Sequence, residues 1–189
     1  MGHFILSFGD LNRYVLRYPQ PATELEHSVN QHTLEDEGHW RWYLDDLERL
    51  GLDPMRPRTA MLRELWSDTT SAARRLTYTL VALAADTPAH ERIALIEVME
   101  ETGNVMFTAL VKVADRLARE EGLELPFCGQ LHLSREHGHT IGMDHRTLAA
   151  IAVSPSEAER IVRKVHAAFD AFEAFVGSLE RYGRAGAER

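Results

Sequence analysis

The chain has 189 residues and a formal net charge of −8, with 21 Lys and Arg against 29 Asp and Glu. This acidic balance excludes a basic surface for nucleic acid or an anionic membrane. No stretch approaches the roughly 18 apolar residues of a membrane span, and the start lacks signal-peptide features, so the expected location is cytoplasmic. The single cysteine, Cys128, excludes an internal disulfide and a multi-thiolate zinc site.

Apolar residues recur at helical spacing from the start of the chain. The first expected helix, 4–17, is interpreted as a short lead-in that ends at Tyr18-Pro19. The second runs from 22 to 50 without a proline and stops before Gly51. A third covers 59–85, and the polar residues at 67–71 are able to break it.

The second half of the chain predicts three more helices, at 88–121, 130–144 and 155–182. Gly122 gives the first of them a stop, and Ser154 with Glu157 forms a capping box for the last. Residues 183–189 are expected to be a frayed tail. No segment has the pattern of a strand, so the sequence predicts a single all-α domain, 1–189, built as a helical bundle.

One pattern, His-x-x-x-acid-x-x-His, occurs twice in the chain. His32, Asp36 and His39 form the first triad, and His132, Glu136 and His139 form the second. Chance supplies roughly 0.07 such patterns for this composition. Residues at i, i+4 and i+7 share one face of a helix, so each triad is expected to present two imidazoles and a carboxylate together.

Two imidazoles and a carboxylate are poor core material but suit a divalent transition metal that takes nitrogen and oxygen ligands. Two facing triads could hold two metals. Glu100 is the candidate that we add from the helix between them, with Glu97 and Glu101 one turn or less away as competitors. The other histidines lack such partners, and Cys128 is interpreted as a buried or loop thiol.

At these residues the chain resembles the haem-oxygenase-like non-haem iron oxidases, which share their helical fold with the TenA thiaminases and PqqC. The last core helix of that family carries His-x-x-x-Asp-x-x-His, and the preceding core helix carries a Glu. His132, Glu136, His139 and Glu100 match those places, while His39 and Asp36 match the family's first core helix. The resemblance implies a haem-oxygenase-like bundle, two iron ions as cofactor and O2 as co-substrate.

The chain departs from the family pattern at two positions. Glu136 stands where the family has Asp, and His32 stands where many members have Glu. The second change lowers the negative charge that faces two iron ions, and Glu35, one turn before His39, is a candidate to compensate.

The favoured hypothesis is therefore an iron-dependent oxidase or oxygenase, with a pair of irons expected, that acts with O2 on a small organic substrate. Its expected partners are that substrate, an electron donor and, as an option, a second copy of the chain, with no nucleic acid and no membrane. One alternative is a metal-free enzyme of the TenA or PqqC type. The other is a non-enzymatic bundle that binds metal or senses oxygen. A haem oxygenase is rejected because it leaves both triads unexplained.

Overall fold

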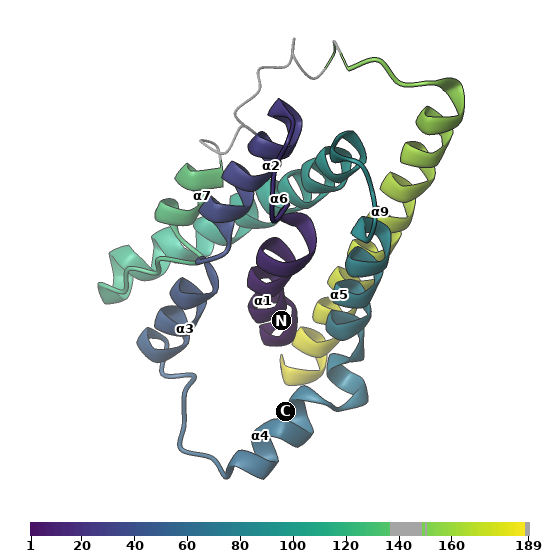
Figure 1. Ribbon diagram of the computed structural model, residues 1–189. Helices are drawn as coiled ribbons and strands as arrows, with labels where there is room; N and C mark the ends of the chain where they lie inside the picture. The colour runs from purple at the N-terminus through teal and green to yellow at the C-terminus, as the bar shows by residue number, and fades with distance from the viewer. Residues whose placement is uncertain (137–148, 150, 188–189) are drawn as a thin grey trace.

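The computed structural model describes residues 1–136, 149 and 151–187, and every regular element in that part is helical, as expected (Figure 1). The elements are α1 (Gly2–Asp10), the π-helical η1 (Leu11–Leu16), α2 (Glu24–Asp36), α3 (Trp40–Arg49), α4 (Arg58–Leu65), the 3-10 turn η2 (Asp68–Thr70), α5 (Ser71–Ala84), α6 (Ala89–Glu121), α7 (Gln130–Glu136) and α9 (Pro155–Ala187). None of the described helices is both long and apolar enough to cross a membrane.

Local signals in the sequence set several helix ends. Gly122 follows α6 in the left-handed conformation, with φ of 70°, and Gly51 follows α3 with φ of 65°. At the start of α9 the Glu157 backbone N–H donates to Ser154 Oγ at 3.3 Å, and the Ser154 N–H donates to Glu157 Oε2 at 2.8 Å. The predicted stops and the predicted capping box are therefore confirmed.

The expected helix 22–50 is wrong as one continuous element, because it breaks between α2 and α3. Across the break the His39 N–H donates to the Asp36 carbonyl, which is a turn bond and not a helical one. Arg17 stabilises this end of α2, because its guanidinium donates to the Thr33 carbonyl at 3.0 Å and to Glu37 Oε2 at 2.8 Å. Gly9 of α1 lies against the same turn, where an added Cβ would be 3.0 Å from the Glu37 carbonyl oxygen.

Two other expected elements also differ from the structure. The helix at 59–85 is divided into α4, η2 and α5, as its polar patch allowed. Arg74 caps the end of α4, because it donates to the Leu65 carbonyl at 2.6 Å. The last helix continues past Tyr182 to Ala187, so most of the expected frayed tail is helical. The part of the expected helix 130–144 that follows Glu136 lies outside the described residues.

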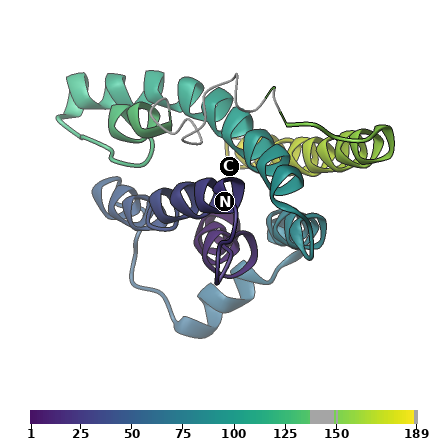
Figure 2. The ribbon, with the colours of Figure 1, turned by 45° about the horizontal axis from the view of Figure 1, so that its top comes forward.

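The interpretation of the first helix as a lead-in is wrong, because α1 lies in the middle of the molecule (Figures 1 and 2). It packs between α3 and α5, while α9 lies along α5 and α7 lies along α6. Phe4 of α1 meets Phe172 of α9 edge to face, with 5.7 Å between the ring centroids. The N-terminal helix thereby becomes one wall of the interior that holds the candidate site.

An ion cluster joins α6 to α9. The Glu91 side chain is 1% exposed, and its two carboxylate oxygens lie 2.7 Å from Arg160 Nε and 2.7 Å from Lys164 Nζ. Burial alone would raise the pKa of Glu91, but the hydrogen bonds and charges of Lys164 and Arg160 outweigh it and lower the pKa.

Replacing Glu91 by glutamine is expected to lower the free energy of unfolding by about 2–3 kcal/mol at neutral pH. The value is below that of a fully buried pair because the Arg160 side chain is 43% exposed. Since the pKa of Glu91 is lower in the folded state, its contribution is present above pH 4.5 and is lost as the pH falls below that value. Urea unfolding at several pH values tests this, with Glu159→Gln as the control because that side chain is 76% exposed. Equal losses in both variants would contradict the role of the cluster.

Candidate metal centre

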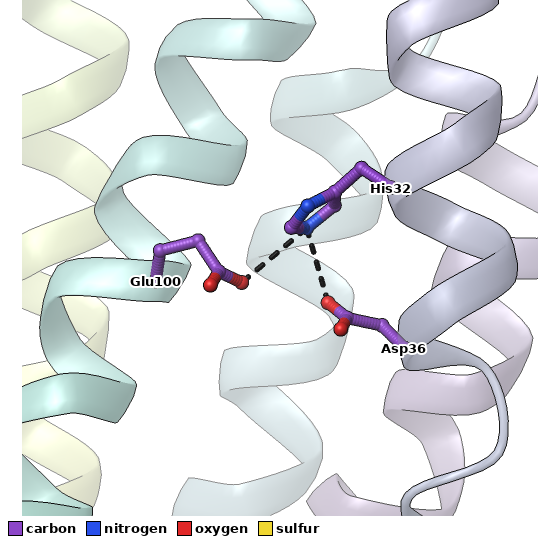
Figure 3. A group of neighbouring side chains, drawn as sticks. All are labelled: His32, Asp36 and Glu100. Atoms are coloured by element: carbon purple, nitrogen blue, oxygen red, sulfur yellow. Dashed lines mark ion pairs between the residues drawn. The ribbon is translucent and has the colours of Figure 1, made fainter. Parts of the chain in front are cut away.

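Three of the predicted ligands meet between α2 and α6 (Figure 3). His32 Nε2 lies 3.0 Å from Asp36 Oδ2 and 3.3 Å from Glu100 Oε1. The side chains of His32 and Asp36 are each 2% exposed, and that of Glu100 is 15% exposed. The helical i, i+4 spacing in α2 aligns the first two, and packing of α6 on α2 supplies the third.

His39 and His132 extend this group toward α7. His39 Nδ1 lies 3.8 Å from Asp36 Oδ1, and the His39 and His132 ring centroids are 4.6 Å apart. His39 also stacks on Trp42, with 4.6 Å between centroids and planes 15° apart. Both imidazoles are buried, so the first triad and the first residue of the second triad face one another in the interior.

The orientation of His132 follows from a short chain of hydrogen bonds. His132 Nδ1 lies 2.9 Å from the Phe127 carbonyl oxygen, and since a carbonyl only accepts, Nδ1 carries the proton. Asp46 of α3 fixes that loop, because its two carboxylate oxygens accept from the backbone N–H groups of Phe127 at 3.1 Å and Cys128 at 2.8 Å. With this proton on Nδ1, Nε2 is the nitrogen that can offer a lone pair, which is the arrangement that metal-binding histidines usually have.

Cys128 is not a candidate nucleophile. Burial and the neighbouring Asp46 carboxylate raise the pKa of the Cys128 thiol to about 12. A thiol with so high a pKa is almost entirely protonated at neutral pH and is a poor nucleophile. This agrees with the interpretation of Cys128 as a structural thiol.

A cavity of about 560 Å³ opens beside the group. Asp36, His39, Glu100 and His132 lie at its polar end, and the remaining wall is mostly aromatic and aliphatic. The volume is within the usual range for small-molecule sites, which are apolar clefts with a few convergent polar groups. The candidate ligands therefore border a space that an organic molecule can occupy.

The other predicted site residues lie at various distances from this group. Glu101 is exposed but borders the cavity, and Glu97 is half-buried on α6. Glu35 is exposed and accepts a hydrogen bond from Gln31 at 2.6 Å, on the outer side of α2. It borders a second hollow of about 570 Å³, which His39 also lines. The side chain of Glu136 and the whole of His139 lie outside the described residues.

Comparison with known proteins gives no match, either to a protein-family model or to a curated protein. The resemblance to the non-haem iron oxidases therefore rests on the residues of the two triads and Glu100.

The donor atoms of His32, Asp36 and Glu100 fit a divalent metal ion. One ligand atom from each residue can be chosen so that all three lie within 4.8 Å of one another. Ligands at about 2.0–2.2 Å from one ion lie about 3 Å apart when they are at right angles, close to the 3.0 and 3.3 Å that separate His32 Nε2 from the two carboxylates. One imidazole and two carboxylates suit iron or manganese better than a soft metal.

A proton competes with a metal for the same nitrogen. Burial lowers the pKa of His32, but the hydrogen bonds to Asp36 and Glu100 and the charges of these carboxylates outweigh it and raise the pKa to about 10. At neutral pH the metal-free cluster therefore holds an imidazolium between two carboxylates. A metal that binds His32 Nε2 has to displace its proton.

We expect the affinity for Mn²⁺ to rise by up to about tenfold per pH unit between pH 6.5 and 8.5, because one proton leaves for each metal bound while the pH is below the pKa of about 10. Titrations followed by the electron paramagnetic resonance of free Mn²⁺ measure this slope. His32→Gln removes the displaced proton and is expected to flatten the slope. His166→Gln, an exposed position on α9, is the control and should retain it. An affinity that is independent of pH in the unaltered chain would contradict metal binding at His32.

Proposed function

We propose that the protein is a non-haem iron oxidase or oxygenase that uses O2 to oxidise a small organic substrate. The observation that carries the proposal is a group of three buried imidazoles, the buried Asp36 and the partly buried Glu100, four of which line the polar end of an apolar cavity. Such a group is costly to bury unless its members are paired or bind a metal. The cavity lets an organic molecule lie directly beside it.

In this proposal His32, Asp36 and Glu100 hold one iron ion, while His39 and His132 contribute to a second, with Glu136 and His139 as further ligands. A haem-oxygenase-like arrangement of the helices belongs to the same proposal. Reduced iron supplies electrons for O2 chemistry, and an external electron donor returns them. The charge of two ferrous ions exceeds that of Asp36, Glu100 and Glu136, which leaves room for an anionic ligand such as hydroxide.

The residues of the chain have distinct tasks. Asp36 lies between His32 and His39, with one carboxylate oxygen near each, so it would be a ligand candidate beside either imidazole. The Phe127 carbonyl keeps His132 in the tautomer whose Nε2 can bind a metal. Phe107 packs on His132, with 3.9 Å between ring centroids, and this apolar contact limits the access of water to the group.

A metal-free enzyme is the second candidate, and one observation favours it. The imidazolium of His32 between Asp36 and Glu100 is a satisfied ion arrangement that could act as an acid at the end of the cavity. The metal-free reading gives no role to His39 beside Asp36 or to His132 beside His39, and for this reason we prefer iron.

Metal analysis of protein that was produced with added iron tests the proposal. We expect between one and two iron ions per chain, and an optical change when the anaerobically reduced protein meets O2. Manganese or zinc in place of iron, with no response to O2, would leave a metal-binding bundle. The absence of bound metal after loading with Fe²⁺ would favour the metal-free enzyme.

A further inference from the structure

The composition of the cavity wall differs from that of the rest of the interior. All seven phenylalanines of the chain line the cavity. None of the described leucines does so, although leucine is much commoner than phenylalanine in the sequence. Leu11, Leu16, Leu76 and Leu80 are buried in the same core cluster as Phe172 and Phe175 but do not line the cavity. An ordinary core would mix the two residue types, so the aromatic lining is a property of this cavity.

Four of the phenylalanines form a connected aromatic surface. Phe4 meets Phe8, Phe172 and Phe175, with ring centroids 5.9, 5.7 and 5.5 Å apart. The Phe4 and Phe172 planes are at 90°. Rings in such edge-to-face and tilted contacts present both faces and edges to the space beside them, and both are favourable partners for another aromatic ring.

Water is a poor occupant of this space. A volume of about 560 Å³ corresponds to on the order of 19 water molecules at about 30 Å³ each. Away from Asp36, His39, Glu100 and His132, the wall offers these waters few hydrogen bonds. An apolar molecule that displaces poorly bonded water gains affinity.

The charges at the cavity argue against an anionic ligand. Among the described lining residues the carboxylates are Asp36, Glu100 and Glu101, and none is lysine or arginine. A ligand carboxylate inside would therefore lie near like charges and meet no lysine or arginine side chain of the described wall. The wall also contains Met1, but burial lowers the pKa of its amino group and so disfavours the charged form. Two residues of the wall are exposed, Val105 of α6 at 72% and Phe169 of α9 at 45%, so the cavity opens to solvent near them.

From the wall, the charges and the opening, we propose that the cavity binds an uncharged, planar aromatic molecule, with its rings against Phe4, Phe172 and Phe175 and one edge facing Asp36, His39 and His132. That this molecule is the substrate rests on the proposed function, whereas its binding does not.

Two fluorescent probes that share one skeleton test the charge preference in the full-length protein as purified. N-phenyl-1-naphthylamine is uncharged, and 8-anilinonaphthalene-1-sulfonate is the same molecule with a sulfonate. We expect the uncharged probe to bind with a stoichiometry near one and at least about tenfold more tightly than the sulfonate. Equal or tighter binding of the sulfonate, or no saturable binding of the uncharged probe, would overturn the inference.

Competition against the bound probe tests the aromatic preference without any substitution. We expect 2-naphthol to displace it at a concentration about three- to tenfold lower than its saturated analogue decahydro-2-naphthol, since aromatic contacts add to area burial. Equal competition would reject an aromatic ligand. A cationic competitor, 1-naphthylmethylammonium, should displace the probe less well than 2-naphthol does. Tighter binding of this amine would show that the acidic end of the cavity selects a cation and would overturn the preference for an uncharged ligand.

Variants locate the binding site. Phe172→Leu is expected to weaken binding of the uncharged probe about three- to tenfold, while Tyr14→Leu, at a site 70% exposed and outside the cavity wall, should leave it unchanged. Melting curves show whether each variant is folded. Fluorescence and iron content are measured separately. Aromatic binding by a protein that holds no iron would reject the proposed function and leave this inference standing. Bound iron with no aromatic preference would reject this inference alone.

Discussion

Replacing His132 by alanine is expected to lower the affinity for Fe²⁺ at least about 100-fold. Loss of a residue that only orients a ligand typically costs 10–100-fold, and His132 would be a ligand itself. Its ring is 2% exposed, lies 4.6 Å from that of His39 and presents Nε2 because Nδ1 donates to the Phe127 carbonyl. Anaerobic titration against a competing chelator measures the affinity.

His132→Asn separates metal binding from packing. An asparagine amide places an N–H near the position of Nδ1 and can still donate to the Phe127 carbonyl, but it has no atom in place of Nε2. We expect this variant to keep most of the stability and to lose as much metal as His132→Ala. His166→Ala is the control, because His166 is exposed on α9. Full iron binding by the folded His132→Asn variant would remove His132 from the ligand set.

Asp46→Ala is expected to have the second large effect, on stability and on metal affinity together. Asp46 is 1% exposed and accepts from two consecutive backbone N–H groups, so its removal leaves two donors in the interior without this acceptor. Each costs about 1–3 kcal/mol, which predicts a loss of about 2–6 kcal/mol in the free energy of unfolding. The Phe127 carbonyl then no longer holds His132 firmly, and the affinity for Fe²⁺ should fall about tenfold.

Asp45→Ala is the matched control, because the neighbouring Asp45 is exposed. Its replacement should change the free energy of unfolding by less than about 0.5 kcal/mol. Nitrogen NMR of the His132 ring separates positioning from stability. We expect the Nδ1-protonated tautomer in the unaltered chain and a mixture of tautomers in folded Asp46→Ala. An unchanged ring signal in that variant would limit Asp46 to a structural role.

The pattern of apolar and polar residues was sufficient for the all-α class and for most helix ends. Capping and helix termination depend on residues a few positions apart, such as Ser154 with Glu157, so they can be inferred from the chain alone. The i, i+4 relation of His32 and Asp36 is equally local, and the structure has it as expected.

The break between α2 and α3 depended on tertiary contacts. Arg17 binds the end of α2, and Gly9 lets α1 approach the turn, from positions far along the chain that helical periodicity does not connect. The turn decides where His39 lies, so the i+7 member of the first triad is placed by packing and not by a continuous helix.

The residues that support the site could not be recognised from the sequence pattern either. The Phe127 carbonyl orients His132, and Asp46 holds the Phe127 backbone from 81 residues away in the chain. An isolated aspartate in the sequence gives no sign of such a partner. The seven phenylalanines come from α1, α6, the loop before α7 and α9. Helical spacing relates those within α1 and those within α9, but no spacing connects the four segments. Local sequence thus determined the helices and the candidate ligands, whereas only the packing of distant segments decided which side chains orient those ligands and which ones form the cavity beside them.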